Sequence, residues 1–412
     1  MLRSGSRFCV DVINVNQGKV GSSMAWPIIS TDSHLGLPYE LADELPAKYR
    51  GFLPRFEERE DGTYFVLPRT TGNRERNKDE TADTRTMGGE FKVDRSDERA
   101  MRQMATGNAT PTSFPGFTPE QRLAEMALEN VVGEVLLGLT AVGVSLADND
   151  AHTAFCRLIN DWLADTYKNH MHQFAPCIAF PLHDLEVAAD EIVRAASMGL
   201  RPIALPDVVP GMPYSSPVWE PIWEAAEACD IPVLLHLSGA FGAIMKSVGA
   251  ESGTPGLTET GFAITTAGAM VSLGWFVNGG ILERHPKLTV AMIECNAGWL
   301  AYAMQQWDHI MHSRFVDRSR TERGGADMNL QAPPSYYVRR QVKCQFMWDP
   351  AAVELRHEIG MDVLIWGNDY PHFEGAFPNS QSWIDNQFAG VPESEVMKIV
   401  HDNAAALLKV SA

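Results

Sequence analysis

Five consecutive segments decide the fold: APCIAFPL (175–182), DLEVAADEIVRAASMG (184–199), RPIALP (201–206), SPVWEPIWEAAEACD (216–230) and IPVLLHLS (231–238). The first, third and fifth are short apolar runs, which are typical of strands buried on both faces. The second and fourth are longer and carry apolar residues at helical spacing, and the second ends at a glycine. Strands that alternate with helices in this way predict a parallel sheet with crossover helices.

The same alternation continues on both sides of this stretch. Further strands are expected at residues 26–31, 132–140, 287–294, 342–347 and 362–369, and further helices at 118–131, 151–170, 263–286, 297–314, 349–360 and 393–410. Eight strands, each followed by helix, predict an α/β fold that closes into a (β/α)8 TIM barrel. A doubly wound sheet is the main alternative, but the first strand is followed by TDSHLGLP, which has no GxGxxG pattern.

Two segments do not fit the alternation. Residues 1–25 show no clear period and are expected to be an N-terminal extension. Residues 55–115 are highly charged with few apolar anchors, which predicts an arm inserted after the first strand. Such an arm is a solvent-exposed loop, an oligomer contact or an active-site lid. We therefore expect a single barrel domain over residues 26–412.

Composition narrows the class of partner and compartment. The formal net charge is −18, which disfavours binding to nucleic acid or to anionic membrane surfaces. The chain has six cysteines and no CxxC pair, and several lie in apolar runs, which indicates free buried thiols in a reducing compartment. No uninterrupted apolar run approaches the roughly 20 residues of a membrane span. We expect a cytoplasmic protein that binds a small-molecule substrate.

Side chains able to bind metal follow five of the expected strands. They are Asp32 and His34 on the first, His183 after the third, His236 on the fifth, Glu294 at the end of the sixth, and Asp369 and His372 after the eighth. Barrel enzymes carry their active sites at this end of the strands. Positions i and i+2 of a strand face the same side, so Asp32 and His34 point together. Carboxylate with imidazole suits Zn, Fe or Mn.

The chain resembles the amidohydrolase superfamily, in the branch of metal-dependent hydrolases and decarboxylases related to aminocarboxymuconate-semialdehyde decarboxylase. The resemblance is clearest in STDSHLGLP (30–38), IPVLLHLSG (231–239), WGNDYPHFEGAFPNS (366–380) and GVPESEVMKIVHDNAAALL (390–408). It implies that Asp32 and His34 form the first-strand ligand pair and that His236 is the fifth-strand ligand. It also implies that Asp369 binds metal and takes the proton of an attacking water.

The chain departs from this family pattern at two positions. Asp32 stands where many members have His or Glu, and a carboxylate there still binds metal. Glu294 stands where the decarboxylases have a catalytic histidine. The rim then offers three carboxylates and up to three imidazoles, which suits one or two Fe, Mn or Zn ions. Glu294 and His183 either bind metal directly or hydrogen-bond to the ligands. The superfamily also includes thioester hydrolases with a diiron centre.

These residues lead to the expectation of a metal-dependent hydrolase that acts on a small-molecule ester, thioester or amide. Activated water attacks the carbonyl, Asp369 acts as general base, and His236 or His183 stabilises the oxyanion. Asp369 or His372 returns the proton, unless His372 only contacts Glu374 in its loop.

Two alternatives remain open. The first is a non-oxidative decarboxylase of an aromatic or enoic acid on the same fold, a reading weakened by Glu294. The second is a non-catalytic binding barrel. Family analogy also suggests a homodimer.

Overall fold

The computed structural model describes residues 25–36, 39–53, 55–67, 70–72, 89–92, 118–138, 144–209, 211–237, 254–264, 266–311, 313, 330–372 and 374–411. Nearly all of the extension expected at residues 1–25 lies outside these ranges, as does much of the charged insertion. The predicted division into extension, insertion and barrel domain therefore stays a prediction.

Eight parallel strands form the barrel. They are β1 (Ile28–Ser30), β6 (Val131–Leu136), β8 (Phe174–Pro176), β9 (Ile203–Pro206), β10 (Val233–His236), β11 (Val290–Ile293), β12 (Val342–Phe346) and β13 (Leu364–Trp366). Strands β1, β6 and β8 pair in that order, and β9 to β13 pair in chain order. A bridge from Ile178 to Ile203 joins the two sheets on one side. On the other side Thr31 N donates to the Trp366 carbonyl at 3.2 Å, so the barrel closes and the predicted fold is confirmed.

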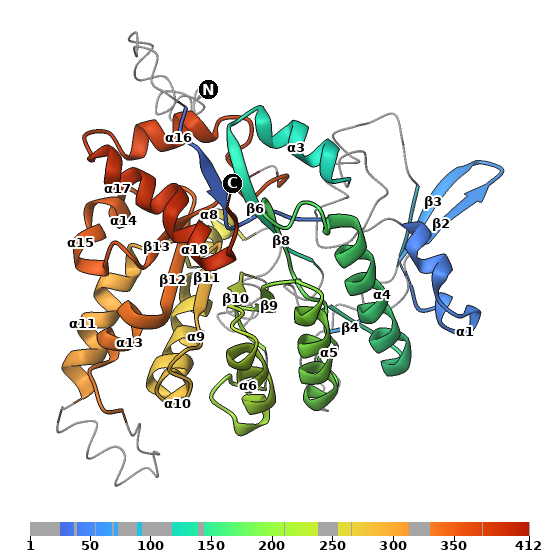
Figure 1. Cartoon of the computed structure of the whole chain (residues 1–412), viewed down its shortest axis with the longest axis horizontal. Coiled ribbons are helices and arrows are strands. Elements are labelled where there is room, and N and C mark those ends of the chain that lie inside the picture. Colours follow the sequence, from blue (N-terminus) through green and yellow to red (C-terminus); the bar gives the residue numbers. More distant parts are fainter. Residues whose placement is uncertain are drawn as a thin grey trace.

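Helices surround these strands, and Figure 1 shows α4, α5, α6 and α9 side by side in this outer layer. The principal helices are α3 (Pro119–Ala127), α4 (Asn149–Tyr167), α5 (Leu185–Ser197), α6 (Glu220–Ala228), α9 (Thr266–Asn278), α11 (Trp299–Met311), α13 (Pro334–Gln341), α14 (Pro350–Glu354), α16 (Ser380–Gln387), α17 (Glu393–Met397) and α18 (Asn403–Leu408). Side-chain caps start several of them: Thr118 accepts from Gln121 N, and Asp184 accepts from Glu186 N and Val187 N.

The predicted terminal helix over 393–410 is interrupted. A π turn, Lys398–Asp402, separates α17 from α18. The side chain of Asn403 donates to the carbonyls of Met361 and Leu364, which ties α18 to the start of β13. Short helices α13 and α16 were not expected from the sequence.

The barrel interior is closed at the N-terminal end of its strands. Interior residues such as Val135, Ala204 and Leu234 belong to one apolar cluster with Leu407 and Val410. Arg201, which precedes β9, donates to the carbonyl of Leu408 at 2.7 Å. The last helix therefore fills this end of the barrel, and the opposite rim is the end left for a site.

The described part of the insertion contains β-structure. Strands β2 (Arg55–Arg59), β3 (Gly62–Leu67) and β5 (Gly89–Lys92) form an antiparallel sheet, and β4 (Thr70–Gly72) pairs with β7 (Val144–Leu146). The β2–β3 hairpin extends away from the barrel strands in Figure 1. The described part of the segment lies between β1 and β6 in the chain. Its role as a solvent-exposed arm, an oligomer contact or a lid stays a prediction.

One helical stretch in the described part of the chain, Glu259–Asn278, is long and apolar enough to cross a membrane by length and composition. A buried helix of a globular protein passes the same test. Within this stretch α9 packs on α10 (Ile281–Arg284), α11 and α13, and Leu273, Phe276 and Val277 are fully buried. Packing in the barrel wall therefore accounts for much of its apolar character.

A buried ion pair connects three parts of the barrel. Arg122 of α3 is 2% exposed, and its Nε donates to Glu134 Oε1 of β6 at 2.5 Å. The second oxygen of Glu134 accepts from Ser33 Oγ at 2.9 Å. The Arg122 guanidinium also lies over the Tyr370 ring, 4.4 Å from its centroid. Arg122 therefore links the second strand, the end of the first, and the loop after the eighth.

We expect Arg122→Met to lower the free energy of unfolding by about 3–5 kcal/mol, because it leaves the Glu134 carboxylate buried without its partner. Arg122→Met/Glu134→Gln should lose less, since no buried charge remains. Urea denaturation measures both. Lys168→Met is the control, because its pair with Asp165 is exposed and should contribute less than about 1 kcal/mol. Equal losses in the single and double variants would contradict the account.

Candidate metal centre

The end of the first strand and the loop after the eighth are joined by backbone hydrogen bonds. Asp369 N donates to the Asp32 carbonyl at 2.9 Å, and His34 N donates to the Tyr370 carbonyl at 2.7 Å. Ser30 Oγ donates to the Asn368 side chain at 2.8 Å, which adds a buried side-chain link. These contacts bring Asp369 next to Asp32 and His34, although it lies more than three hundred residues after them in the sequence.

Two carboxylates flank the His34 ring. Its Nε2 lies 3.1 Å from Asp369 Oδ1 and 3.4 Å from Asp32 Oδ1. Both aspartates are fully buried. Burial raises the pKa of Asp32, but the imidazoles of His236 and His34 outweigh it and hold that pKa well below its usual range.

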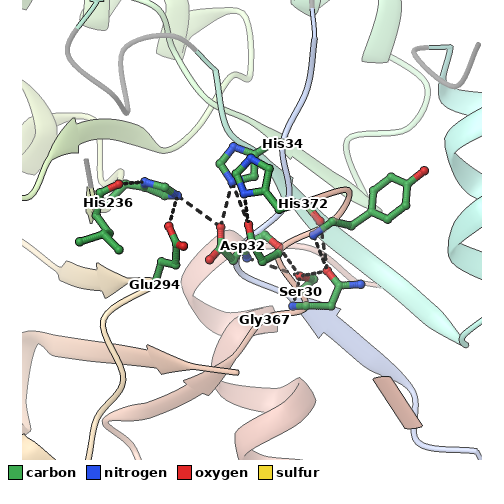
Figure 2. A network of polar contacts seen from close by, with 12 residues as sticks. Ser30, Asp32, His34, His236, Glu294, Gly367 and His372 are labelled. Carbon is green, nitrogen blue, oxygen red and sulfur yellow. Dashed lines mark hydrogen bonds and ion pairs between the residues drawn. The ribbon is translucent and has the colours of Figure 1, made fainter. Parts of the chain in front are cut away.

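His236, the last residue of β10, approaches from the opposite side (Figure 2). Its Nε2 lies 3.5 Å from Asp32 Oδ1 and 3.5 Å from Glu294 Oε2. Its Nδ1 lies 2.6 Å from the Leu237 carbonyl, which can only accept, so Nδ1 carries a proton. In the neutral ring Nε2 then presents its lone pair to the centre, as a metal-binding histidine requires.

Glu294 and Asp369 share an unusual backbone conformation. Their φ angles are 56° and 54°, in the left-handed region that residues other than glycine seldom occupy. Glu294 N donates to Gln345 Oε1 at 2.5 Å, which helps to hold this turn at the end of β11. Burial and the charge of Asp369 raise the pKa of the Glu294 carboxyl well above its usual range.

His372 also belongs to the cluster. Its Nδ1 lies 2.9 Å from Asp369 Oδ1, and its ring stacks on His34 with centroids 4.1 Å apart. The loop after β13 makes this possible, because His372 N donates to the Asp369 carbonyl at 2.9 Å. This geometry places His372 in the cluster and does not favour the alternative that His372 only contacts Glu374 in its loop.

His183 lies apart from these groups. Its ring is 5.9 Å from that of His152, and Nε2 lies 3.5 Å from Thr153 Oγ1. Among the residues that the structure describes, sets of ligand atoms within 4.8 Å of one another include none with His183. The geometry therefore gives no support to His183 as a metal ligand or as a group that stabilises an oxyanion.

His152 itself should make stability depend on pH. Burial, and then the charge of His183, lowers its pKa to about 4. The unfolded chain takes up this proton near pH 6.5 and the folded chain does so only near pH 4. Stability is therefore full above pH 6.5 and falls as the pH drops towards 4, by up to about 3 kcal/mol from this group. Urea denaturation across that range should show a shallower fall in His152→Gln; parallel curves would contradict the assignment.

Several buried polar atoms of the centre lack a hydrogen bond to any described residue: Asp32 Oδ1 and Oδ2, Asp369 Oδ2 and His236 Nε2. Buried polar atoms are normally satisfied, and a cation would satisfy these. Asp32, His34 and His236 form one set of ligand atoms within 4.8 Å, and His34, Asp369 and His372 form another. The donor set of carboxylate oxygens and imidazole nitrogens fits a divalent metal such as Mn, Fe or Zn.

Gly367 allows the first and eighth strands to approach. A Cβ at this position would lie 2.7 Å from Asp32 Cβ, 2.8 Å from Gln345 Nε2 and 2.9 Å from Asp32 N. Two of these atoms belong to Asp32, so a side chain here would displace a candidate ligand directly.

We expect Gly367→Ala to lower stability by about 1–3 kcal/mol through this overpacking and to weaken metal binding. Thermal unfolding and equilibrium dialysis with Mn²⁺ measure the two effects. Gly51→Ala is the matched control, because an added Cβ there meets nothing within 4 Å. Unchanged metal affinity in Gly367→Ala would show that Asp32 is not held in this way.

Comparison with known proteins identifies the family. The amidohydrolase family model matches residues 114–410. The chain belongs to the amidohydrolase family. The match begins after Asp32 and His34, so it includes His236, Glu294 and Asp369 but not the first-strand pair.

Among relatives, the gamma-resorcylate decarboxylase of Polaromonas sp. strain JS666 is 22% identical over 311 residues, which is 71% of this chain and 88% of that protein. A crystal structure of an amidohydrolase from Mycobacterium avium subsp. paratuberculosis K-10 matches with a TM-score of 0.64 and 19% identity over 94% of this chain and all of that one. The 5-carboxyvanillate decarboxylase of Novosphingobium aromaticivorans, solved with manganese and 4-hydroxy-3-methoxy-5-nitrobenzoic acid, matches with a TM-score of 0.62 and 18% identity over 95% and 98%.

The relatives correct the expected reaction. The prediction of an ester, thioester or amide hydrolase was wrong, because the relatives matched over most of their length are decarboxylases. Glu294 in place of a histidine had counted against decarboxylation. A rim of carboxylates and imidazoles around a metal serves either reaction, so this ligand set could not separate them.

Three contributors to the site were missed or left unassigned by sequence reasoning. Arg122 and Glu134 support the first strand, and Glu374 joins Glu294 and Asp369 in a third set of ligand atoms within 4.8 Å. A hint for Glu374 existed, since it follows Asp369 in the same short loop. Nothing in the local sequence indicated that Arg122 would be buried.

Proposed function

We propose that this amidohydrolase is a metal-dependent non-oxidative decarboxylase of an aromatic carboxylic acid. The observation that carries the proposal is the convergence of Asp32, His34, His236 and Asp369, with orphaned buried atoms, in a chain whose relatives are gamma-resorcylate decarboxylases. The manganese in the related 5-carboxyvanillate decarboxylase supports a divalent ion in the same kind of centre.

Asp32, His34, His236 and Asp369 would hold the ion. When bound, it supplies positive charge that attracts and neutralises the oxygens of an aromatic carboxylate. The Leu237 carbonyl keeps Nε2 of His236 free for this role, and the Asp369 and Tyr370 backbone contacts keep Asp32 and His34 in place.

The reaction replaces a carboxylate with a proton: the ring carbon gains a proton, its bond to the carboxylate carbon breaks, and carbon dioxide leaves. Asp369 Oδ1 and His372 Nδ1, 2.9 Å apart, are the pair placed to carry that proton. His372 is partly exposed and can exchange protons with solvent, whereas Asp369 is buried. The stacked His34 ring fixes the orientation of His372.

Compartment and assembly form part of the proposal. The cysteines that the structure describes are all free, which supports a reducing compartment such as the cytoplasm. We retain the expectation of a homodimer.

Decarboxylation can be tested in heavy water. The Mn²⁺-loaded protein is incubated in D₂O with 2,6-dihydroxybenzoate or 5-carboxyvanillate, and NMR follows loss of the acid and the isotope in the product. We expect the product to carry deuterium at the ring carbon that held the carboxylate. The carboxylate is replaced by an exchangeable hydrogen of the enzyme, which is deuterium in D₂O. Asp369→Asn should lower the rate by at least roughly 100-fold.

Lys168→Met, remote from the rim, serves as the activity control. Survival of both acids and of a wider panel of hydroxybenzoates, with Mn²⁺, Zn²⁺ or Fe²⁺, would overturn the proposal.

A further inference from the structure

We propose that Gln345 is a positioning residue of the site, whose side-chain amide holds the ends of β11 and β13 in the geometry that the metal centre needs. The inference rests on the metal centre of the proposed function, but its test does not depend on the identity of the reaction. Gln345 belongs to β12, which pairs with β11 on one side and with β13 on the other. The residue is 1% exposed.

Gln345 is a polar residue in the apolar interior of the barrel. Its register partner on β13 is Ile365, which belongs to the interior apolar cluster. Its chain neighbours Cys344 and Phe346 belong instead to the cluster that includes residues of the surrounding helices. Successive residues of a strand point to opposite faces, so the Gln345 side chain points into the barrel. A buried amide is costly unless it is hydrogen-bonded, so the hydrogen bonds of this residue explain its presence better than packing does.

The amide oxygen holds the turn that carries Glu294. The backbone pairing of β11 with β12 ends at Met292 and Cys344, and beyond it Glu294 N donates to Gln345 Oε1 at 2.5 Å. Glu294 has a φ of 56°, a conformation that residues other than glycine seldom adopt without support from their surroundings. In this conformation its Oε2 lies 3.5 Å from His236 Nε2, so Gln345 acts on the centre through Glu294.

The amide nitrogen contacts the end of β13. Gln345 Nε2 donates to the Gly367 carbonyl at 3.5 Å, a longer and weaker contact than the first. A Cβ on Gly367 would lie 2.8 Å from this nitrogen and 2.7 Å from Asp32 Cβ, so the amide packs beside Asp32 against the same glycine. The amide therefore supports both carboxylates that approach His236 Nε2, those of Asp32 and Glu294.

An amide meets the requirements of both neighbours. Oε1 faces an N–H group and must accept, whereas Nε2 faces a carbonyl and must donate. A carboxylate at this position would lack the donor and would add negative charge beside Glu294 and Asp32. A methionine of the same length would make neither hydrogen bond. We therefore expect loss of the amide to disturb the centre more than it disturbs the fold.

Gln341 provides a matched control, because it lies directly before β12, at the end of the strand away from the rim. It is 4% exposed, and its Nε2 donates to the carbonyls of His285 and Leu288 at 2.7 and 2.9 Å. Replacement of Gln341 removes the hydrogen bonds of a buried amide, as replacement of Gln345 does, but at the closed end of the barrel. Gln341→Met should therefore lower the melting temperature and leave the centre unchanged.

The test is binding of Mn²⁺ to the metal-free full chain without substrate, measured by equilibrium dialysis. We expect Gln345→Met to weaken Mn²⁺ binding by roughly 10–100-fold, the loss typical when a residue that orients metal ligands is removed. With Mn²⁺ at saturation, kcat for 2,6-dihydroxybenzoate or 5-carboxyvanillate should fall by roughly 10-fold or more, because the reacting groups are misplaced. Gln341→Met should match the wild type in both measurements, although thermal unfolding of the metal-free proteins should show similar melting temperatures for the two variants.

Gln345→Leu, which suits the apolar interior and makes neither hydrogen bond, is the second variant if Gln345→Met does not fold. Equal Mn²⁺ affinity in the wild type and in both methionine variants would overturn the inference, and so would equal losses in the two variants. A selective loss of affinity in Gln345→Met, with no decarboxylation by the wild type, would refute the proposed function and keep the inference. Decarboxylation by the wild type, with affinity and kcat unchanged in Gln345→Met, would keep the function and overturn the inference.

Discussion

The burial of Asp32 is the constraint on which the rest of the site depends. A carboxylate removed from water is stable as an anion only beside positive charge or hydrogen-bond donors. Here the neighbours are the rings of His34 and His236, each within 3.5 Å, and both oxygens still lack a hydrogen bond to a described residue. The fold therefore buries an anion that a cation would neutralise, and the surrounding contacts must hold this carboxylate in place away from water.

The contacts that hold Asp32 in place lie where the first and eighth strands of the barrel meet. The first and eighth strands close the barrel, and Gly367 lets them approach so nearly that an added Cβ would collide with Asp32. On the outer side of the strands, Arg122 neutralises Glu134, which in turn accepts from Ser33, the residue between the candidate ligands Asp32 and His34. Closure of the barrel and support of the centre are thus the same set of interactions.

Much of this architecture is predictable from the sequence, and the reason is local. Each strand is a short apolar run and most helices have apolar residues at helical spacing, so the sequence predicts the order of elements and hence the barrel. Because the candidate site residues follow the ends of strands, the sequence also predicts that they meet at one rim: Asp32, His34, His236, Glu294 and Asp369. What local patterns cannot give is the depth of a side chain in the assembled barrel. His183 also follows a strand but turns towards His152, and Arg122 reads as an ordinary helix-surface residue although it is buried.

The wrong prediction of hydrolysis has a related cause. It considered only that Glu294 stands in place of a histidine. The effect of Glu294 on the reaction depends on the residues that surround it. Beside Asp369 and Glu374 a glutamate concentrates negative charge, and burial with Asp369 raises its pKa well above the usual range. Such a cluster either retains protons or recruits metal. In a site whose relatives act on aromatic acids, a neutralised cluster lets an anionic substrate approach, so the carboxylate departs from the family pattern without excluding decarboxylation.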